Sequence, residues 1–272
     1  MLDSYAVIGN PIAHSKSPLI HTAFAQQTHQ ALHYGAILAP LDGFRNTVES
    51  FRQQGGKGLN VTVPFKLEAY RLATRLTERA SIAQAVNTLK FENDEILGDN
   101  TDGAGLVRDI ECNLEIPIAD KRVLLMGAGG AAQGVILPLL QRHPSLLAIA
   151  NRTPQKAQAL QQQFITYGNI VSGDFMRFSG ENFDLIINAT SASLHDALPE
   201  LPIDLFAHTT LAYDMMYSHE PTRFLQFAQK NGAHQIADGF GMLVEQAAES
   251  FFLWRGIRPQ TKPVIAQLRS LI

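Results

Sequence analysis

A glycine-rich turn between a strand-like and a helix-like segment constrains the fold of this chain most strongly. A predicted strand over residues 122–126 leads directly into Gly127-Ala128-Gly129-Gly130-Ala131-Ala132, and a helical pattern continues from Ala131 to Arg142. The turn fits the pattern G-x-G-x-x-A, whose small residues allow a tight turn and let a pyrophosphate approach the free N–H groups at the helix N-terminus. The sequence therefore predicts a dinucleotide-binding unit here, with a tight turn that binds nothing as the alternative.

The segments after this turn continue the same alternation of strand and helix. Further strands are predicted at Leu146–Ala150, Leu185–Asn188 and Leu211–Asp214, and a helix at Pro154–Phe164. This order is typical of a doubly wound, Rossmann-like parallel sheet.

The end of the second strand indicates which dinucleotide is bound. A site for NAD usually has an Asp or Glu there, which binds the ribose 2′-hydroxyl. Here the strand runs into Asn151-Arg152-Thr153, with Lys156 one helical turn further on. Arg152 can bind a 2′-phosphate and no carboxylate is present to repel it, so NADP(H) is favoured over NAD. The alternative is a solvated arginine on a loop.

The first hundred residues predict a second α/β region. Strands are expected at Tyr5–Gly9, Leu32–Leu38 and Gly58–Val63, helices at Ser17–Gln27, Lys66–Leu72 and Thr77–Ala83, and a hairpin across Asn93-Asp94. Alternating strands and helices favour an α/β sheet of mostly parallel order. Two more helices are expected near the C-terminus, over Gly241–Trp254 and after Pro263.

Length and composition exclude several classes of protein. The chain has 272 residues, enough for two moderate domains, and 46% hydrophobic against 17% charged residues is ordinary for a globular protein. A net charge of −3 gives no general attraction for nucleic acid or anionic membranes. With one cysteine, no signal-like N-terminus and no apolar run of membrane-spanning length, we expect a cytoplasmic protein. The nine histidines form no cluster with metal-ligand spacing, so no metal site is expected.

Small polar residues gather in three segments of the first region. The first runs from Asn10 to Pro18 and places Ser15 and Ser17 before a helix, where an anion is favoured, although Ser17 could instead be only an N-cap. The second, Asn60-Val61-Thr62-Val63-Pro64-Phe65-Lys66, puts Asn60 and Thr62 on one side of a strand and Lys66 just past its end.

The third segment combines Ala85-Val86-Asn87-Thr88 with Gly98-Asp99-Asn100-Thr101-Asp102-Gly103. Asp102 opens a predicted helix, where an N-cap would be its ordinary role. A lysine and an aspartate at the mouth of a cleft are also a plausible proton-transfer pair.

Taken together, these segments resemble the shikimate dehydrogenase family in order and spacing over essentially the whole chain. The resemblance extends to Asn151-Arg152-Thr153, Tyr213-Asp214-Met215-Met216-Tyr217 and Gly241-Met242-Leu243-Val244-Glu245-Gln246-Ala247. It implies an N-terminal α/β substrate domain, residues 1–101 completed by 238–272, and an NADP domain over residues 102–237, with the active site in the cleft between them. The sequence does not distinguish a monomer from a homodimer.

The resemblance also implies residue roles. Ser15, Ser17 and Tyr217 would hold the carboxylate of shikimate, while Asn60, Thr62, Asn87 and Gln246 would contact the ring hydroxyls or position their neighbours. Lys66 and Asp102 would flank the reacting oxygen. The Gly127–Ala131 loop would bind the pyrophosphate, and Asn151, Arg152, Thr153 and Lys156 would bind the 2′-phosphate. Met215 and Gly239 would line the nicotinamide pocket.

Two alternatives remain open from the sequence. A quinate/shikimate dehydrogenase shares the fold and the Lys-Asp pair but would accept quinate and use NAD, which Arg152 argues against. A non-catalytic nucleotide-sensing protein on the same scaffold would have no need for Lys66, Asp102 and both serines.

Overall fold

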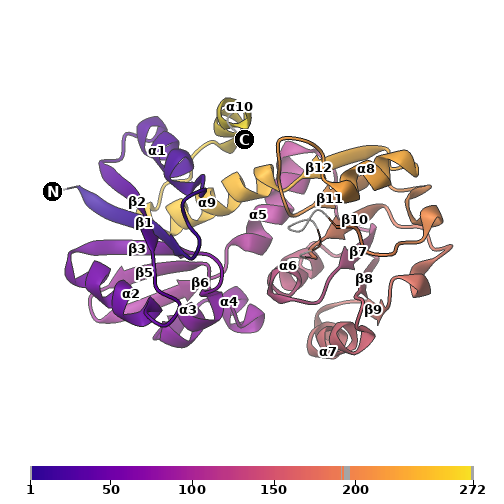
Figure 1. Cartoon of the computed structure of the whole chain (residues 1–272), viewed down its shortest axis with the longest axis horizontal. Helices are drawn as coiled ribbons and strands as arrows, with labels where there is room; N and C mark the ends of the chain where they lie inside the picture. The colour runs from indigo at the N-terminus through magenta and orange to yellow at the C-terminus, as the bar shows by residue number, and fades with distance from the viewer. Residues whose placement is uncertain (1, 191, 193–196, 271–272) are drawn as a thin grey trace. The chain divides into compact units, whose positions relative to one another are not determined.

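The computed structural model describes residues 2–190, 192 and 197–270, and the chain divides into two compact units. The first comprises Met1–Gly105 with Val244–Leu271, and the second comprises Leu106–Leu243 (Figure 1). The chain passes from one unit to the other inside helices α5 (Asp102–Arg108) and α9 (Phe240–Arg255). Both boundaries therefore lie within helices, a few residues later than the expected boundaries after residues 101 and 237.

The first unit contains a six-stranded mixed sheet in the order β2-β1-β3-β5-β6-β4. Its strands are β1 (Asp3–Gly9), β2 (Leu32–Leu38), β3 (Gly56–Val61), β4 (Arg75–Leu76), β5 (Thr88–Glu92) and β6 (Glu95–Asp99). Strand β1 is parallel to β2 and β3, while the hairpin strand β5 is antiparallel to both β3 and β6. The predicted third strand thus begins and ends two residues earlier than expected, so Thr62 and Val63 lie beyond it.

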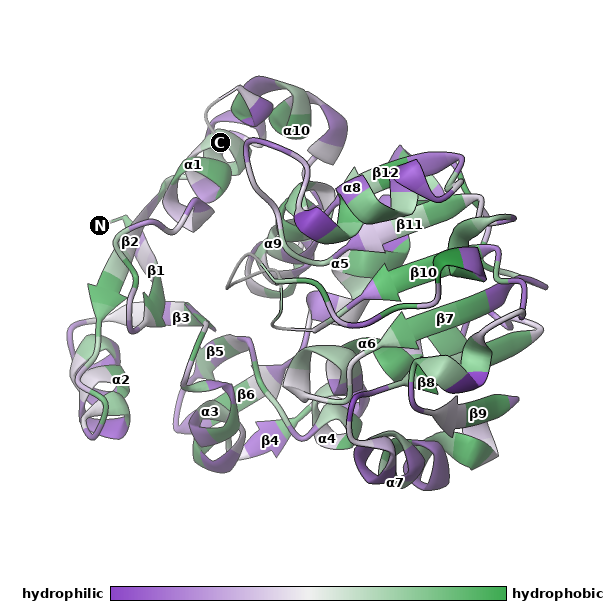
Figure 2. Ribbon diagram, turned by 45° about the vertical axis from the view of Figure 1, so that its right-hand side comes forward, coloured by the Kyte–Doolittle hydropathy of each residue, from purple (hydrophilic) through white to green (hydrophobic). Residues whose placement is uncertain are grey.

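Helices cover both faces of this sheet. Helices α2, α3 and α4 lie on one face, and α1, α9 and α10 on the other (Figures 1 and 2). Their bounds are α1 (Ser17–Gln27), α2 (Phe44–Gln53), α3 (Lys66–Leu72), α4 (Glu78–Ala83) and α10 (Thr261–Arg269). Alternation along β1 explains the two layers, because Ala6 and Ile8 pack toward α2 and α3 while Tyr5 and Val7 pack with Trp254 of α9.

An aromatic cluster on the second of these faces encloses a histidine. The His21 ring is fully buried and stacks on Tyr34 with ring centroids 4.1 Å apart, and Trp254 and Phe251 lie beside it. Neither ring nitrogen has a hydrogen-bond partner of normal geometry. Burial lowers the pKa of His21 to about 3, against which the nearby Asn60 side chain acts only weakly. His21 is therefore neutral at physiological pH.

The second unit contains a six-stranded parallel sheet in the order β12-β11-β10-β7-β8-β9. The strands are β7 (Arg122–Met126), β8 (Leu146–Ala150), β9 (Ile170–Gly173), β10 (Leu185–Asn188), β11 (Leu211–Asp214) and β12 (Gln235–Asp238). Apart from Arg122 at the start of β7 and Asn188 at the end of β10, these two central strands are apolar (Figure 2), as expected when both faces of a parallel sheet are covered. The strand order is that of the doubly wound dinucleotide-binding fold, which confirms the predicted fold class.

The helices of the second unit begin where the sequence supplies a start signal. They are α6 (Gly130–Leu140), α7 (Pro154–Phe164) and α8 (Arg223–Lys230), with a π-helical turn (Asp109–Asn113) and 3₁₀ turns (Ile165–Tyr167, Met176–Phe178, Ile203–Phe206). Pro154 opens α7, and the hydroxyl of Thr222 accepts a hydrogen bond from the Leu225 backbone N–H at the start of α8.

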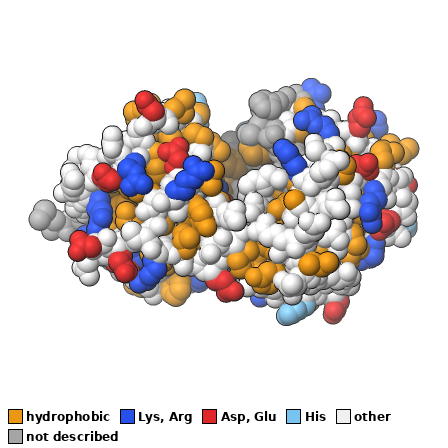
Figure 3. Space-filling model, turned by 90° about the horizontal axis from the view of Figure 1, so that it is seen from below, with side chains coloured by type: hydrophobic (Ala, Val, Ile, Leu, Met, Phe, Trp, Pro, Cys, Tyr) orange, Lys and Arg blue, Asp and Glu red, His pale blue; other side chains and the backbone are white. Residues whose placement is uncertain are grey.

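The surface carries charges of both signs. Acidic and basic side chains are interspersed with apolar ones on the face shown in Figure 3. None of the helices in the described part of the chain combines the length and the apolar character needed to span a membrane.

Candidate active site

The predicted polar segments of the first unit meet at one edge of its sheet. Strands β1, β3 and β6 run in the same direction and the antiparallel β5 begins where they end. Because the carboxyl ends of parallel strands share an edge, Ser17, Lys66 and Asp102 follow strands that end there, and Asn87 precedes one that starts there. The topology thus brings together segments that are far apart in sequence.

An ion pair between Lys66 and Asp102 lies at the centre of this edge. The Lys66 ammonium is 2.5 Å from the Asp102 Oδ2. The exposed fraction is 33% for the Lys66 side chain and 15% for the Asp102 side chain. The Asp102 Oδ1 accepts a hydrogen bond of 2.8 Å from the Asn87 Nδ2, and the Asp102 backbone N–H donates to the Asn100 Oδ1 at 3.1 Å. The pair is therefore held in place from the aspartate side while the lysine remains partly open to solvent.

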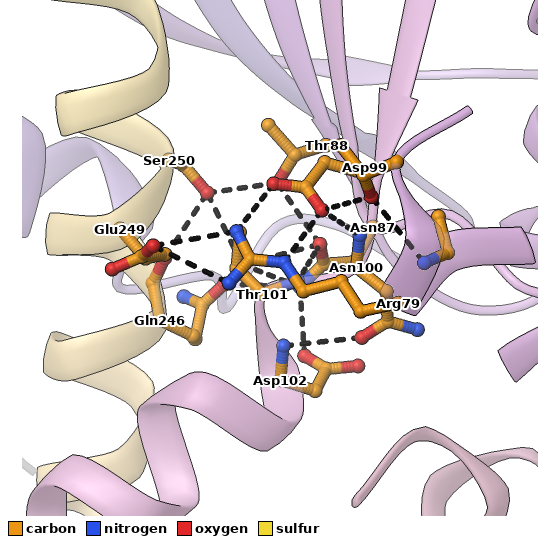
Figure 4. A network of polar contacts seen from close by, with 12 residues as sticks. Arg79, Asn87, Thr88, Asp99, Asn100, Thr101, Asp102, Gln246, Glu249 and Ser250 are labelled. Atoms are coloured by element: carbon orange, nitrogen blue, oxygen red, sulfur yellow. Dashed lines mark hydrogen bonds and ion pairs between the residues drawn. The ribbon is translucent and has the colours of Figure 1, made fainter. Parts of the chain in front are cut away.

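Asn87 joins this pair to helix α9. Its Nδ2 lies 2.9 Å from the Thr101 Oγ1 and 3.3 Å from the Gln246 Oε1 (Figure 4). Its Oδ1 accepts from the Thr101 backbone N–H and from the Thr88 hydroxyl, each at 2.9 Å. Asn87 is buried with all its polar atoms partnered, so its orientation is determined before any ligand arrives.

Asn60 carries the network across the sheet. Its Nδ2 donates to the Ser250 Oγ at 2.9 Å and its Oδ1 accepts from the Tyr34 hydroxyl at 2.7 Å. Burial raises the pKa of Tyr34 well above its usual value, and the nearby Ser17 side chain opposes this shift only weakly. A continuous set of polar contacts therefore links Tyr34 to Asn60, and through Ser250 and Thr101 to Asn87.

The two serines precede and open helix α1. Ser17 is the first residue of the helix and Lys16 occupies the N-cap position, with no side-chain cap, so the alternative reading of Ser17 as an N-cap is wrong. The Ser17 backbone N–H instead donates to the Ser15 Oγ at 3.3 Å. Thr62 lies just past β3, where its methyl group approaches Gly9 so closely that a Cβ there would be 2.5 Å away.

In the second unit, the glycine loop has the conformation that the motif requires. Gly127 has a φ of +111°, and a Cβ at this position would lie 3.0 Å from the Ala189 carbonyl oxygen, so the turn itself needs glycine. Gly129 and Gly130 are exposed, and a Cβ on either would meet no described atom within 4 Å. Protein packing does not explain these two glycines, whereas a pyrophosphate at the N-terminus of α6 would.

Cationic side chains follow the end of β8, where they could bind the 2′-phosphate of a dinucleotide. Arg152, Thr153 and Lys156 are exposed, and Asn151 donates from its Nδ2 to the Thr153 carbonyl at 2.9 Å. Among residues within the described ranges, no carboxylate pairs with Arg152 or Lys156. Because β7 and β8 are parallel neighbours, the glycine loop and these cations lie at the same edge of the sheet. This arrangement fits NADP.

Met215 and Gly239 lie side by side after β11 and β12. A Cβ on Gly239 would lie 2.1 Å from the Met215 carbonyl oxygen, and the Gly239 N–H donates to the Met216 carbonyl at 3.0 Å. Tyr217 follows on the same loop and packs against Phe240, with ring centroids 6.0 Å apart. Partial burial, with a smaller effect of the Asp238 charge, raises the pKa of Tyr217, so its hydroxyl is a neutral donor at physiological pH.

Several members of the network were not singled out from the sequence. Tyr34 reads as an ordinary strand aromatic, and Ser250 as a small residue on a helix. The position of Ser250, one turn after Gln246, was a usable signal, because residues four apart share a helix face. Arg79 gave no signal, because its partners Asp99 and Glu249 are distant in sequence. Of the residues the structure describes, no three His, Cys, Asp or Glu gather as metal ligands.

Comparison with known proteins identifies the family. Three family models match: the shikimate dehydrogenase substrate-binding domain at residues 7–89, shikimate/quinate 5-dehydrogenase at 111–197, and the shikimate 5′-dehydrogenase C-terminal domain at 239–269. The chain is 67% identical to the shikimate dehydrogenase (NADP(+)) of Nitrosomonas eutropha, over 98% of this chain and 97% of the relative.

Solved structures of similar proteins support the same family assignment. An Ael1 enzyme from Pseudomonas putida is 52% identical with a TM-score of 0.94, and 98% of each chain is covered. Shikimate 5-dehydrogenase from Thermus thermophilus, in complex with NADP(H) and shikimate, is 31% identical with a TM-score of 0.88 over the full length of both chains. The chain therefore belongs to the NADP-dependent shikimate dehydrogenase family, a family of oxidoreductases.

Proposed function

We propose that this chain catalyses the reversible NADPH-dependent reduction of 3-dehydroshikimate to shikimate, in the pathway to chorismate and the aromatic amino acids. Family membership supports the activity, and the NADP(+) specificity in the name of the Nitrosomonas eutropha relative supports the choice of cofactor. The observation that carries the mechanism is the Lys66–Asp102 ion pair of 2.5 Å at the shared edge of the sheet.

Lys66 is the proton-transfer group in this proposal. NADP, when bound, supplies the hydride chemistry at the ring carbon. In the direction of reduction, the Lys66 ammonium donates a proton to the carbonyl oxygen and stabilises the negative charge that develops there. In the direction of oxidation, the Lys66 amine accepts the hydroxyl proton. Asp102 is fixed by Asn87 and Asn100, and it keeps the lysine aimed at the oxygen.

The remaining residues orient the substrate. The Ser15 and Ser17 hydroxyls, with Tyr217, would hold the carboxylate, and the position of Ser17 at the start of α1 suits a negative charge. Thr62, Asn87 and Gln246 would contact the ring hydroxyls. Asn60 is buried and bonded on both sides, which fits a role in positioning its neighbours.

The second unit would bind the cofactor through backbone N–H groups and cationic side chains. The Gly127–Ala131 loop would hold the pyrophosphate, and Arg152, Asn151, Thr153 and Lys156 would hold the 2′-phosphate. Met215 and Gly239 would line the nicotinamide site. The exposed cations favour NADP over NAD, and so argue against a quinate dehydrogenase that uses NAD.

A crossed assay tests this function. Purified protein is given shikimate or quinate with NADP⁺ or NAD⁺, and formation of the reduced nicotinamide is followed by absorbance. We expect rapid turnover only with shikimate and NADP⁺. Efficient turnover of quinate with NAD⁺ would place the protein with the sister activity, and no turnover by folded protein in any combination would favour a nucleotide sensor.

A further inference from the structure

Arg79 lies outside every role assigned so far, yet it contacts two elements that hold the substrate site. It stands in the first turn of α4, with 27% of its side chain exposed. Its Nε donates to the Asp99 Oδ1 at 2.7 Å and its Nη2 to the Asp99 Oδ2 at 2.5 Å. Both of its terminal nitrogens lie 3.3 Å from the Glu249 Oε1 of α9 (Figure 4). One guanidinium therefore joins the end of β6 to α9.

Asp99 transmits this contact to the proton-transfer pair. Its carboxylate is almost completely buried and its Oδ1 also accepts from the Asn100 backbone N–H at 2.7 Å. The Asn100 side chain in turn accepts from the Asp102 backbone N–H. The Asp99 carbonyl accepts from the Asn87 N–H at 3.0 Å. The position of Asp99 therefore influences the backbone of Asp102, which is paired with Lys66, and of Asn87, which bonds to the Asp102 carboxylate.

Glu249 transmits the contact to the other wall of the site. It follows Gln246 by three residues and directly precedes Ser250, so fixing Glu249 fixes the helix face that bears both. Gln246 and Ser250 lie within hydrogen-bond distance of Asn87 and Asn60, respectively. The Arg258 Nη2 donates to the second Glu249 oxygen, Oε2, at 2.6 Å, so both oxygens of this carboxylate are bonded to arginines.

The chemistry of the contact calls for arginine. A planar guanidinium can bind one carboxylate through two parallel N–H groups and still reach a second, which an ammonium cannot do. Burial alone would lower the pKa of Arg79, but the bonds and charges of Asp99 and Glu249 more than offset it, so the pKa is raised and the cation is permanent.

We propose that Arg79 is a positioning residue of the substrate site, which ties β6 to α9 and thereby aligns Asp102 with Lys66 and Gln246. The inference rests on the proposed shikimate dehydrogenase activity. It predicts that a change at Arg79 affects shikimate and the proton transfer but leaves the handling of NADP⁺ unchanged.

The test compares Arg79→Lys and Arg79→Met with the control Arg75→Met. Arg75 carries the same charge four residues earlier, on strand β4, but its ion pairs with Glu92 and Glu95 are exposed. For each variant, kcat, both KM values and the pH profile of kcat/KM for shikimate are measured, per active site counted by NADP⁺ binding.

For Arg79→Met we expect kcat/KM for shikimate to fall on the order of 10²-fold, because small misplacements of catalytic groups have effects of this size. For Arg79→Lys, which keeps the charge beside buried Asp99, we expect a loss of about tenfold with a displaced pH profile. The KM for NADP⁺ and all parameters of Arg75→Met should stay within about twofold of wild type.

The inference would be overturned if folded Arg79→Lys had the kcat/KM and pH profile of the wild type. It would also be overturned if kcat/KM fell equally for shikimate and for NADP⁺. If Arg79→Met does not fold, Arg79→Lys decides alone. Failure of the proposed function would be distinguishable, since the wild-type protein would then show no turnover with shikimate and NADP⁺.

Discussion

The two units prepare their binding edges in opposite ways. In the first unit, the side chains at the strand ends are bonded to one another: Asn87 alone contacts Thr101, Asp102 and Gln246. In the second unit, the corresponding edge presents exposed glycines and exposed cations such as Arg152. Both edges lie at the carboxyl ends of parallel strands, so the difference comes from the side chains and not from the topology.

This difference matches the chemistry proposed for each unit. Proton transfer needs groups held to within a fraction of an ångström, and a buried hydrogen-bond network provides that rigidity. A pyrophosphate needs only N–H groups and positive charge, which a loop at a helix N-terminus provides. We therefore expect changes in the first unit to act mainly on kcat and changes in the second mainly on the KM for NADP⁺.

The largest effect is expected from Lys66→Met. Removal of the proton-transfer group should lower kcat by about 10²–10⁴-fold, while the KM for NADP⁺ changes little. Steady-state kinetics measure both, and Lys57→Met, an exposed position on β3, serves as the control. A Lys66→Met enzyme with nearly normal kcat would remove Lys66 from the mechanism.

Arg152→Ala should show the opposite pattern. Loss of a charge-assisted contact to the 2′-phosphate should raise the KM for NADP⁺ by about ten- to hundredfold and leave kcat and the use of NAD⁺ nearly unchanged. Lys156→Ala should have a smaller effect, because an ammonium on a flexible stem binds phosphate less specifically. An equal loss with both cofactors would argue against a 2′-phosphate contact.

The buried histidine predicts a pH dependence confined to the first unit. The pKa of His21 is about 3 in the folded chain, against 6.5 for an ordinary histidine. Between these values the unfolded chain binds a proton that the folded chain does not, so stability is complete above pH 6.5 and falls as the pH drops toward 3. The slope contributed by one such group is at most about 1.4 kcal/mol per pH unit.

Fluorescence of Trp254, the single tryptophan, reports on this region because its ring lies 5.4 Å from that of His21. Denaturant titrations between pH 7 and pH 5 should lose this slope in His21→Phe but keep it in His33→Gln, whose side chain is exposed. Equal slopes in both variants would show that other groups govern the acid sensitivity.

The smallest effect is expected from Gly129→Ala. Gly129 has a φ of −95°, which alanine adopts readily, and no described atom lies near an added Cβ, so thermal stability should not change. The methyl group would stand where the pyrophosphate approaches, and the KM for NADP⁺ should rise by about tenfold or less. Unchanged NADP⁺ binding would indicate that the loop does not contact the cofactor at this residue.

The sequence predicted the elements whose signals are local. The bounds of α1, β2, α3, β7, β8, α7, β10 and β11 agree with the structure, because apolar runs, prolines and glycines mark them. Helix α2 was missed because Gly43 gives no side-chain cap and no acidic residue stands in its first turn. The unit boundaries lie inside α5 and α9, where the chain offers no break in composition.

For the site, the sequence supplied the residues but not their connections. Lys66 and Asp102 were named as a plausible pair from their places after two strands, but their contact depends on a sheet in which β3 and β6 end at the same edge. Tyr34 and Arg79 act through partners far along the chain, and no periodicity or spacing reveals such contacts. These roles emerge only from tertiary packing.

Calorimetric titration of shikimate into the protein free of cofactor tests the contrast between the units most directly. If the substrate edge is assembled by its own side chains, shikimate should bind to one site without NADP⁺. Asn87→Ala should weaken this binding by about tenfold or more, and Arg152→Ala should leave it unchanged. An unchanged affinity for shikimate in Asn87→Ala, or loss of shikimate binding in Arg152→Ala, would contradict the assignment of substrate to the first unit and cofactor to the second.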